Sequence, residues 1–220
     1  MIQFEGVSKV YDNQLALKEI TLTIEKGELA FVTGPSGAGK TTLLKLIYAH
    51  ERPDKGRLTV GEFDLSTIPE RDIPRLRRQI GIVFQDFRLI DSKTVFENVA
   101  MPLRIRGMSD RDLRDIVYES LRLVGLRHKI DSYPPTLSGG EQQRVAIARA
   151  IVAEPLILLA DEPTGNLDPE NTKSIMNIFK EINARGTTVV IATHNPDLYT
   201  HSGRRVFKLK EGYLTGVEIL

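Results

Sequence analysis

Short, largely apolar runs alternate along this chain with longer segments in which apolar residues recur every three or four positions. The short runs lie at residues 29–33, 80–84, 156–160 and 188–192. A strand that is covered on both faces needs no polar side, so these runs predict buried strands of a parallel sheet. Ile175, Ile178, Phe179 and Ile182 follow the helical period and predict the core face of a helix. The alternation predicts an α/β fold with helices on the faces of the sheet.

The first part of the chain has a different pattern. Apolar and polar residues alternate over residues 4–10 and 15–24, with Asn13 and Gly27 as turn points. Alternation of period two indicates strands with one buried and one solvated face. We therefore expect an N-terminal antiparallel β subdomain at the edge of the main sheet.

Residues 86 to about 135 are mainly helical in pattern. Ser109 and Asp112 have the spacing of a capping box at the start of one helix. The segment 133–136 contains two prolines and breaks the pattern, and a return helix is predicted to begin at Ser138. We expect one domain, residues 1–220, with an inserted α-helical subdomain at about 86–150.

The composition and net charge of the chain exclude several classes of function. The net charge is +1 over 220 residues, so there is no basic excess for neutralising nucleic-acid phosphates, and no nucleic-acid partner is expected. The chain has no cysteine, which excludes disulfides and thiolate metal sites. No apolar run approaches the length of a membrane span, and residue 1 begins directly in a strand-like pattern. We expect a cytosolic protein whose link to a membrane comes through a partner.

A phosphate loop of the form Gly-x4-Gly-Lys-Thr lies between the predicted strand 29–33 and a predicted helix at 42–48. The predicted nucleotide contacts are Gly34, Pro35, Ser36, Gly37, Ala38, Gly39, Lys40, Thr41 and Thr42. Glycines allow the backbone to close around the β- and γ-phosphates. Lys40 is predicted to bridge these phosphates, and the Thr41 hydroxyl to bind Mg²⁺.

Two carboxylates follow the apolar run 156–160. Asp161 and Glu162 lie where a strand of a parallel sheet ends, which is the edge that faces the nucleotide. Asp161 is predicted to hold Mg²⁺ through water, and Glu162 to polarise the attacking water. The alternative role of Glu162 is that of an N-cap ahead of Thr164 and Gly165.

Three further side chains are candidates because of their positions. His194 ends the strand-like run 187–193 and would face the γ-phosphate from the other side of Glu162, although a lone histidine is usually structural. Gln85 ends the run 80–84, where its amide can reach Mg²⁺ or the attacking water. Tyr11 could stack on the adenine ring, and the alternative is a half-exposed strand tyrosine.

A second glycine-rich helix start occurs at residues 137–142. Ser138, Gly139, Gly140 and Glu141 offer backbone N–H groups and a positive helix end, both suited to a phosphate. If the inserted helices stand away from the core, these groups cannot reach the chain's own phosphate loop. We therefore expect a two-fold dimer that sandwiches two ATP molecules between the copies. Asp168 would lie along the seam of this dimer.

Taken together, these motifs resemble the ATP-binding cassette (ABC) family of ATPases over residues 4–212. The resemblance implies a P-loop NTPase core of the RecA-like type and Mg²⁺-dependent ATP hydrolysis. Residues 159–168 are similar to the branch that contains macrolide and lipoprotein exporters and a cell-division ATPase. The cell-division group is the most similar, and it implies an integral membrane partner that docks near Gln85 and a location at the cytoplasmic face of the inner membrane.

Two other functions stay open at this point. One is the ATPase of a lipoprotein or macrolide-type exporter. The other is a nucleotide-gated module that clamps DNA or a ribosome, but such proteins usually carry two cassettes or a long coiled coil. This chain has one cassette and no heptad run.

Overall fold

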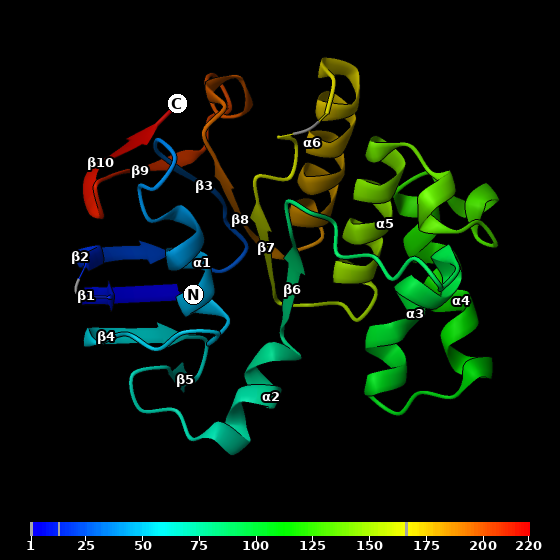
Figure 1. The fold of residues 1–220 in the computed structure, drawn as a ribbon, viewed down its shortest axis with the longest axis horizontal. Helices are drawn as coiled ribbons and strands as arrows, with labels where there is room; N and C mark the ends of the chain where they lie inside the picture. Colours follow the sequence, from blue (N-terminus) through cyan, green and yellow to red (C-terminus); the bar gives the residue numbers. More distant parts are fainter. Residues whose placement is uncertain (1, 13, 166) are drawn as a thin grey trace.

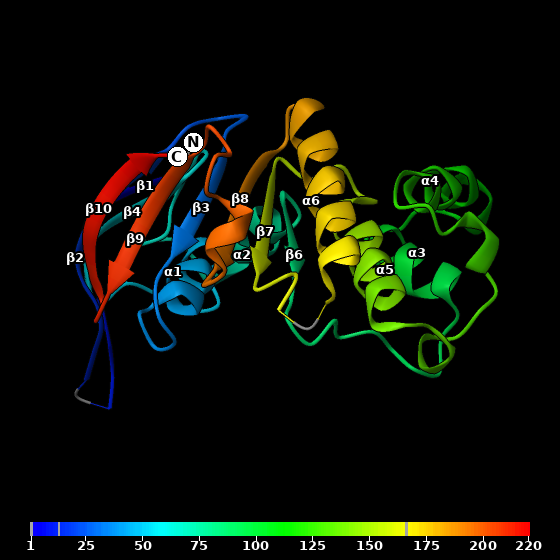
Figure 2. The same cartoon turned by 90° about the horizontal axis from the view of Figure 1, so that it is seen from above.

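The computed structural model describes residues 2–12, 14–165 and 167–220, and the predicted turn at Asn13 lies outside these ranges. The described residues form one four-stranded sheet, in the spatial order β2-β1-β4-β5, and one six-stranded sheet, in the order β10-β9-β3-β8-β7-β6. Figure 1 shows the smaller sheet at one end of the molecule and the helices α3 and α4 at the other. Figure 2, turned by 90°, shows the same separation.

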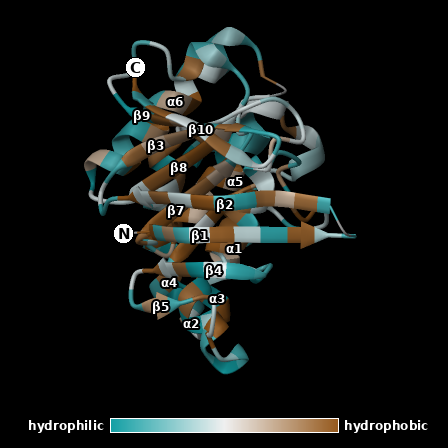
Figure 3. Ribbon diagram, turned by 90° about the vertical axis from the view of Figure 1, so that its left-hand side faces the viewer, coloured by the Kyte–Doolittle hydropathy of each residue, from teal (hydrophilic) through white to brown (hydrophobic). Residues whose placement is uncertain are grey.

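The antiparallel sheet consists of β1 (Ile2–Tyr11), β2 (Gln14–Ile24), β4 (Lys55–Val60) and β5 (Phe63–Asp64). Its pairings are all antiparallel, which confirms the N-terminal β subdomain predicted from the alternating pattern. Figure 3 faces this sheet and shows hydrophilic and hydrophobic residues mixed along β1 and β2. Strands β4 and β5 were not predicted, because their apolar residues are too few to give a pattern.

The larger sheet has five parallel strands and one antiparallel edge strand. Its strands are β3 (Leu29–Thr33), β6 (Ile80–Val83), β7 (Ile157–Asp161), β8 (Thr188–Thr193), β9 (Arg205–Lys210) and β10 (Tyr213–Ile219). The four predicted strands agree with β3, β6, β7 and β8 to within one residue at each end. Strands β9 and β10 extend the sheet beyond β3 and were not predicted, and only β10 runs antiparallel to its neighbour.

Helices cover both faces of this sheet. They are α1 (Lys40–Ile47), α2 (Ile73–Arg77), α3 (Val95–Ile105), α4 (Asp110–Leu123), α5 (Gly139–Ile151) and α6 (Pro169–Ala184). Short 3₁₀ turns lie at Glu70–Asp72, Arg127–Lys129, Pro134–Thr136 and Pro196–Leu198. Among the described residues, no helix combines the length and the apolar character that crossing a membrane requires.

The two faces of β3 belong to different cores, as the period of a strand requires. Ala30 and Val32 pack with α1 and the antiparallel sheet, so α1 lies between the two sheets. Leu29 and Phe31 point to the opposite face and pack with α3, α5 and α6. A strand buried on both faces needs no polar face, which explains why its sequence is an almost continuous apolar run.

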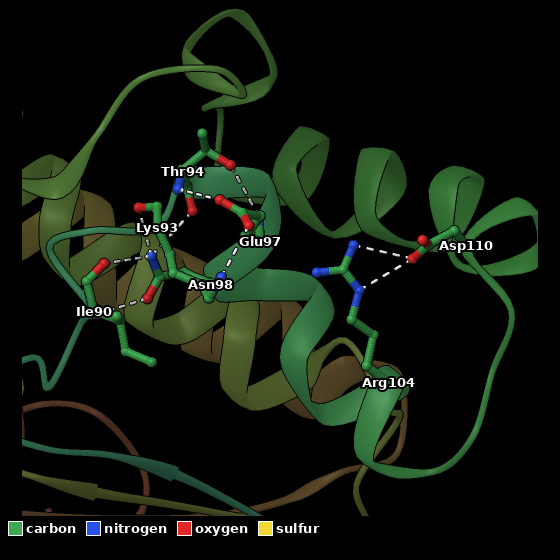
Figure 4. A network of polar contacts seen from close by, with 7 residues as sticks. All are labelled: Ile90, Lys93, Thr94, Glu97, Asn98, Arg104 and Asp110. Carbon is green, nitrogen blue, oxygen red and sulfur yellow. Dashed lines mark hydrogen bonds and ion pairs between the residues drawn. The ribbon is translucent and has the colours of Figure 1, made fainter.

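Residues 86–150, which are predicted to form an inserted helical subdomain, contain α3, α4 and all but the last residue of α5. Thr94 and Glu97 form a capping box at α3, and Asn98, fully buried, bonds the backbone of Ile90, Lys93 and Thr94 (Figure 4). Ser109 caps α4 as predicted, but the capping box expected there is incomplete. The Ser109 hydroxyl donates to the Asp112 carboxylate at 2.6 Å, so this carboxylate bonds the hydroxyl and not a backbone N–H.

Candidate functional site

The phosphate loop follows β3 directly and ends at Gly39, the N-cap of α1. Gly34 and Gly39 have φ angles of 152° and 104°, which favour glycine. A Cβ atom at Gly34 would lie 2.2 Å from the carbonyl oxygen of Leu209, and one at Gly39 would lie 2.7 Å from that of Ala16. These two glycines are therefore required both by backbone conformation and by close packing. Because Gly39 caps the helix, α1 begins two residues earlier than predicted, at Lys40.

A cavity of about 870 Å³ opens above this loop, which is within the size range of small-molecule sites. Its walls bring together most of the predicted site: residues 34–42, Gln85, Glu162 and His194. It is also lined by Tyr199 and Lys208, which the sequence analysis did not identify. Lys208 lies on β9, a strand without a predictive pattern, so no sequence signal pointed to it.

Lys40 lies on the floor of this cavity with its side chain largely buried. Its ammonium donates to the carbonyl oxygens of Gly34 at 2.8 Å and Pro35 at 3.2 Å, and lies 3.4 Å from Oε1 of Glu162. The phosphate loop and the end of β7 thus face each other across a short gap. A cation at this position, among backbone N–H groups at a helix N-terminus, suits the phosphates of a nucleotide.

Glu162 has an unusual backbone conformation, with φ 46°. Its N–H donates to the carbonyl oxygen of Ala192 at 2.8 Å, which joins the end of β7 to β8. Its Oε1 lies 2.9 Å from Nδ1 of His194, and the His194 N–H donates to Oε2 at 3.3 Å. The predicted proximity of Glu162 and His194 is therefore present. The alternative role of Glu162 as an N-cap is wrong, because Asp168 caps the following helix.

Asp161 is the last residue of β7, and one of its carboxylate oxygens is buried without a hydrogen-bond partner. Burial raises the pKa of this carboxyl, the charge of Glu162 adds to the increase, and the Thr41 hydroxyl opposes it. A buried carboxylate oxygen without a partner beside a hydroxyl fits a divalent cation. Among the described residues, no group of three or more His, Cys, Asp or Glu side chains is arranged so that it could hold a metal ion.

Tyr11 ends β1 and does not contribute to the walls of the phosphate-loop cavity. Its hydroxyl is buried without a hydrogen-bond partner, and burial raises its pKa. The ammonium of Lys9 lies 5.3 Å from the centre of the tyrosine ring. Stacking of Tyr11 on adenine therefore stays a prediction.

The second glycine-rich motif begins α5, at a distance from the phosphate loop of the same chain. Ser138 caps the helix, and Ser138 and Glu141 form a complete capping box. Of the residues 138–141, none contributes to the cavity walls. A Cβ atom at Gly140 would lie 2.6 Å from Oδ1 of Asn171, whereas one at Gly139 would make an ordinary contact at 3.9 Å. Packing within the chain thus explains the glycine at position 140 but not the one at position 139. The sequence alone did not reveal this difference.

Asn171 connects this motif to the start of α6. Its N–H and its side-chain amide donate to the Asp168 carboxylate at 2.8 and 2.6 Å, and its Oδ1 accepts from Arg144 of α5 at 3.0 Å. The predicted Asp168 is therefore an N-cap, and the Asn171 side chain links it to α5. Asn171 and Arg144 were not predicted, because their spacing in the sequence carries no motif.

Comparison with known proteins agrees with this geometry. The ABC transporter family matches residues 17–165. The chain is 49% identical to the Escherichia coli (strain K12) protein named Cell division ATP-binding protein FtsE, over 98% of each chain. It is also 49% identical to the protein of that name from Bacillus subtilis (strain 168), over 97% of this chain and 94% of the relative.

Solved structures of the same architecture cover the whole chain. The ATP-binding cassette MJ0796, in a dimeric post-hydrolysis state bound to ADP and Pi, superimposes with a TM-score of 0.92 at 36% identity, over 100% of this chain and 99% of the other. The cbiO1 protein of Clostridium perfringens, part of the ABC transporter complex cbiONQ, gives a TM-score of 0.91 at 32% identity, over 99% and 88%. Both the nucleotide-site strands and the inserted helices are thus shared with known cassettes.

Proposed function

The chain belongs to the ABC transporter family of ATPases, and we propose that it is the ATP-hydrolysing subunit of a membrane complex that acts in bacterial cell division. The observation that carries this proposal is the meeting of Lys40, Glu162 and His194 in one cavity above a phosphate loop. The cell-division role is supported by the FtsE relatives, which match nearly the full length of the chain. Their names favour this role over that of an exporter subunit.

In the proposed mechanism, Glu162 accepts a proton from the water that attacks the γ-phosphate. His194 and Lys40 both contact the same carboxylate oxygen and fix the direction in which it points. Lys40 also neutralises the phosphates, so it must exchange its bonds to Gly34 and Pro35 for phosphate oxygens. Thr41, Asp161 and Gln85 would hold Mg²⁺, which neutralises charge on the β- and γ-phosphate oxygens.

The site is proposed to be completed by a second copy of the chain. Ser138 and Gly139 are exposed at the N-terminus of α5, Gly140 is buried, and none of the three contributes to the cavity of their own chain. Such an N-terminus favours a phosphate. The similarity to dimeric cassette structures supports a homodimer, in which residues 138–141 of one copy close over the ATP of the other.

A groove beside Gln85 is the proposed docking site of the membrane partner. It has a volume of about 570 Å³ and lies among α2, β6, α3 and α5. Its apolar wall includes Pro74, Ile82, Phe84, Met101, Pro102 and Ile105. The occupant would be a short cytosolic helix of an FtsX-like integral membrane protein, and such docking would hold this chain at the cytoplasmic face of the inner membrane. Phe84 directly precedes Gln85, so docking there can influence the nucleotide site.

Purification of the tagged protein from membranes tests the partner. We expect an FtsX-like protein to accompany it, whereas an exporter permease would favour the alternative subunit role. Ile105→Glu should abolish this association and leave ATP hydrolysis intact, because Ile105 is 74% exposed in the groove. Ile219→Glu is the matched control, since Ile219 is 73% exposed on β10. Equal retention of the partner by both variants would contradict docking in this groove.

A further inference from the structure

The loop after Gln85 contains two successive residues with left-handed backbone conformations. Phe87 and Arg88 have φ angles of 55° and 51°. Left-handed conformations are unfavourable for large side chains, and two in a row require support from the surrounding structure. Within the loop, the Phe87 N–H donates to the carbonyl oxygen of Phe84 at 3.3 Å and the Arg88 N–H to that of Asp86 at 2.5 Å. The Arg88 guanidinium lies 3.2 Å from the Asp86 carboxylate and 4.0 Å from the centre of the Phe84 ring. None of these contacts involves the carbonyl groups of Phe87 and Arg88.

Further support comes from Arg149, on the helix that begins with the second glycine-rich motif. Its Nη1 donates to the carbonyl oxygen of Arg88 at 2.5 Å, and its Nη2 donates to that of Phe87 at 2.6 Å. One guanidinium thus bonds the carbonyl groups of both left-handed residues. The sequence separation is 61 and 62 residues, so only the tertiary structure brings these groups together.

The environment of Arg149 is unusual for an arginine, a residue that is mostly exposed in proteins. Burial lowers the pKa of its guanidinium, and among the described residues no carboxylate forms an ion pair with it. Arg149 is only partly buried, and a partly buried cation without a counter-ion still needs hydrogen-bond acceptors around its N–H groups. The carbonyl groups of Phe87 and Arg88 accept these hydrogen bonds, so the loop and Arg149 stabilise each other's position.

We propose that Arg149 is a positioning residue that fixes the loop of Gln85 to the helix α5 and couples it to the movement of that helix. The inference rests on the proposed function, in which Gln85 would help to hold Mg²⁺ and the N-terminus of α5 closes over the nucleotide of a second copy. Helix α5 is also bonded to the start of α6 through Arg144 and Asn171. A displacement of α5 on dimer closure therefore reaches Gln85 through a rigid helix and two charged hydrogen bonds.

Arg149→Gln tests this proposal, with Arg77→Gln as the matched control. Arg77 also donates to two successive carbonyl groups, those of Tyr48 at 3.2 Å and Ala49 at 2.9 Å. Ala49 is left-handed as well, with φ 53°, but it is not in the loop of Gln85. We expect Arg149→Gln to lower kcat about tenfold, the factor that one charged hydrogen bond supports, with the KM for ATP unchanged. Arg149→Lys should restore part of kcat, and Arg77→Gln should leave it unchanged.

Amide hydrogen exchange gives a readout that does not depend on hydrolysis. Exchange at residues 85–89 should become faster in Arg149→Gln and stay unchanged in Arg77→Gln. If the wild type exchanges slowly here but hydrolyses no ATP, the proposed function fails and the contact made by Arg149 still stands. Unchanged exchange in Arg149→Gln, or equal losses of kcat in both variants, would overturn the proposal.

A second pair of substitutions shows whether a loss of kcat in Arg149→Gln comes from the loop or from general misfolding. Arg88→Gly removes the penalty of the left-handed conformation, while Arg88→Ala loses the same contact with Phe84 and keeps the Cβ atom. In the Arg149→Gln background, we expect Arg88→Gly to recover kcat about threefold relative to Arg88→Ala, since glycine lowers this penalty. Equal kcat values for the two double variants would contradict the role assigned to Arg149.

Discussion

Nδ1 of His194 lies 2.9 Å from Oε1 of Glu162, although the two residues are 32 positions apart. They directly follow the neighbouring parallel strands β7 and β8, whose register pairs Asp161 with Ala192. The Glu162 side chain is 12% exposed, whereas that of His194 is 64% exposed. The sheet therefore presents a largely buried carboxylate with a histidine at its open side, which is the arrangement that orients a general base.

Glu162→Gln should reduce the rate of phosphate release by about 10²- to 10⁴-fold, because an amide cannot accept the proton of the attacking water. ATP binding should persist, since the phosphate loop is unchanged. The variant is expected to accumulate as an ATP-bound dimer in size-exclusion chromatography. Undiminished hydrolysis by this variant would remove Glu162 from the proposed role.

Asp161→Asn should abolish Mg²⁺-dependent hydrolysis but stabilise the nucleotide-free protein by about 1 kcal/mol at pH 7, because it removes a buried charge with an unpaired oxygen. The direction of the pKa shift sets the pH dependence. A raised pKa in the folded state means that wild-type stability is highest below the ordinary pKa of the carboxyl and falls as pH rises through the raised value. The difference in unfolding free energy between variant and wild type should therefore grow from pH 4 upward.

Denaturant unfolding across this pH range measures that difference. Asp197→Asn is a suitable control, because Asp197 is exposed in the turn Pro196–Leu198 and its carboxylate is not part of the proposed magnesium site. A stability difference for Asp161→Asn that does not change with pH would argue against a raised pKa at this position.

Gly140→Ala should destabilise the protein by about 1–3 kcal/mol, the usual range for overpacking. The added Cβ atom would lie 2.6 Å from the Asn171 side chain, which is held by Asp168 and Arg144 and cannot move without losing those bonds. Gly139→Ala is the matched control, because its contact at 3.9 Å is ordinary. Thermal unfolding compares the two variants, and Asn171→Ala should relieve the effect of Gly140→Ala. Equal melting temperatures for the two glycine variants would show that Gly140 does not pack tightly against Asn171.

Complementation between inactive variants tests the shared site. Lys40→Met disables the phosphate loop and Ser138→Arg disables the second motif, so each homodimer should be inactive. A mixed dimer retains one intact site, and activity should return to at most about a quarter of wild type in an equal mixture. The specific activity of the wild type should also rise with protein concentration. Mixed dimers without any activity, or a specific activity that is independent of concentration, would argue against sites shared between copies.

Much of the site could be predicted because its residues follow strand ends. A parallel sheet places the carboxyl ends of its strands at one edge, so Gln85, Asp161 and His194 could be assigned to the same site from their positions after apolar runs. The phosphate loop was predictable for a similar reason, since its glycines are required by backbone conformation. By contrast, β9 and β10 lack such a pattern and were not predicted. Lys208 lies on β9, so it was not identified as a residue of the site.

By itself, the sequence determined the class of fold, the phosphate loop and the residues that follow the buried strands, because apolar period and backbone geometry are local properties. Only the tertiary structure decided which distant groups meet. The contact of Arg149 with Phe87 and Arg88, and that of Gly140 with Asn171, join segments whose separation in the sequence carries no period. Such contacts depend on how helices pack on a sheet, and packing is set by the shapes of many side chains at once.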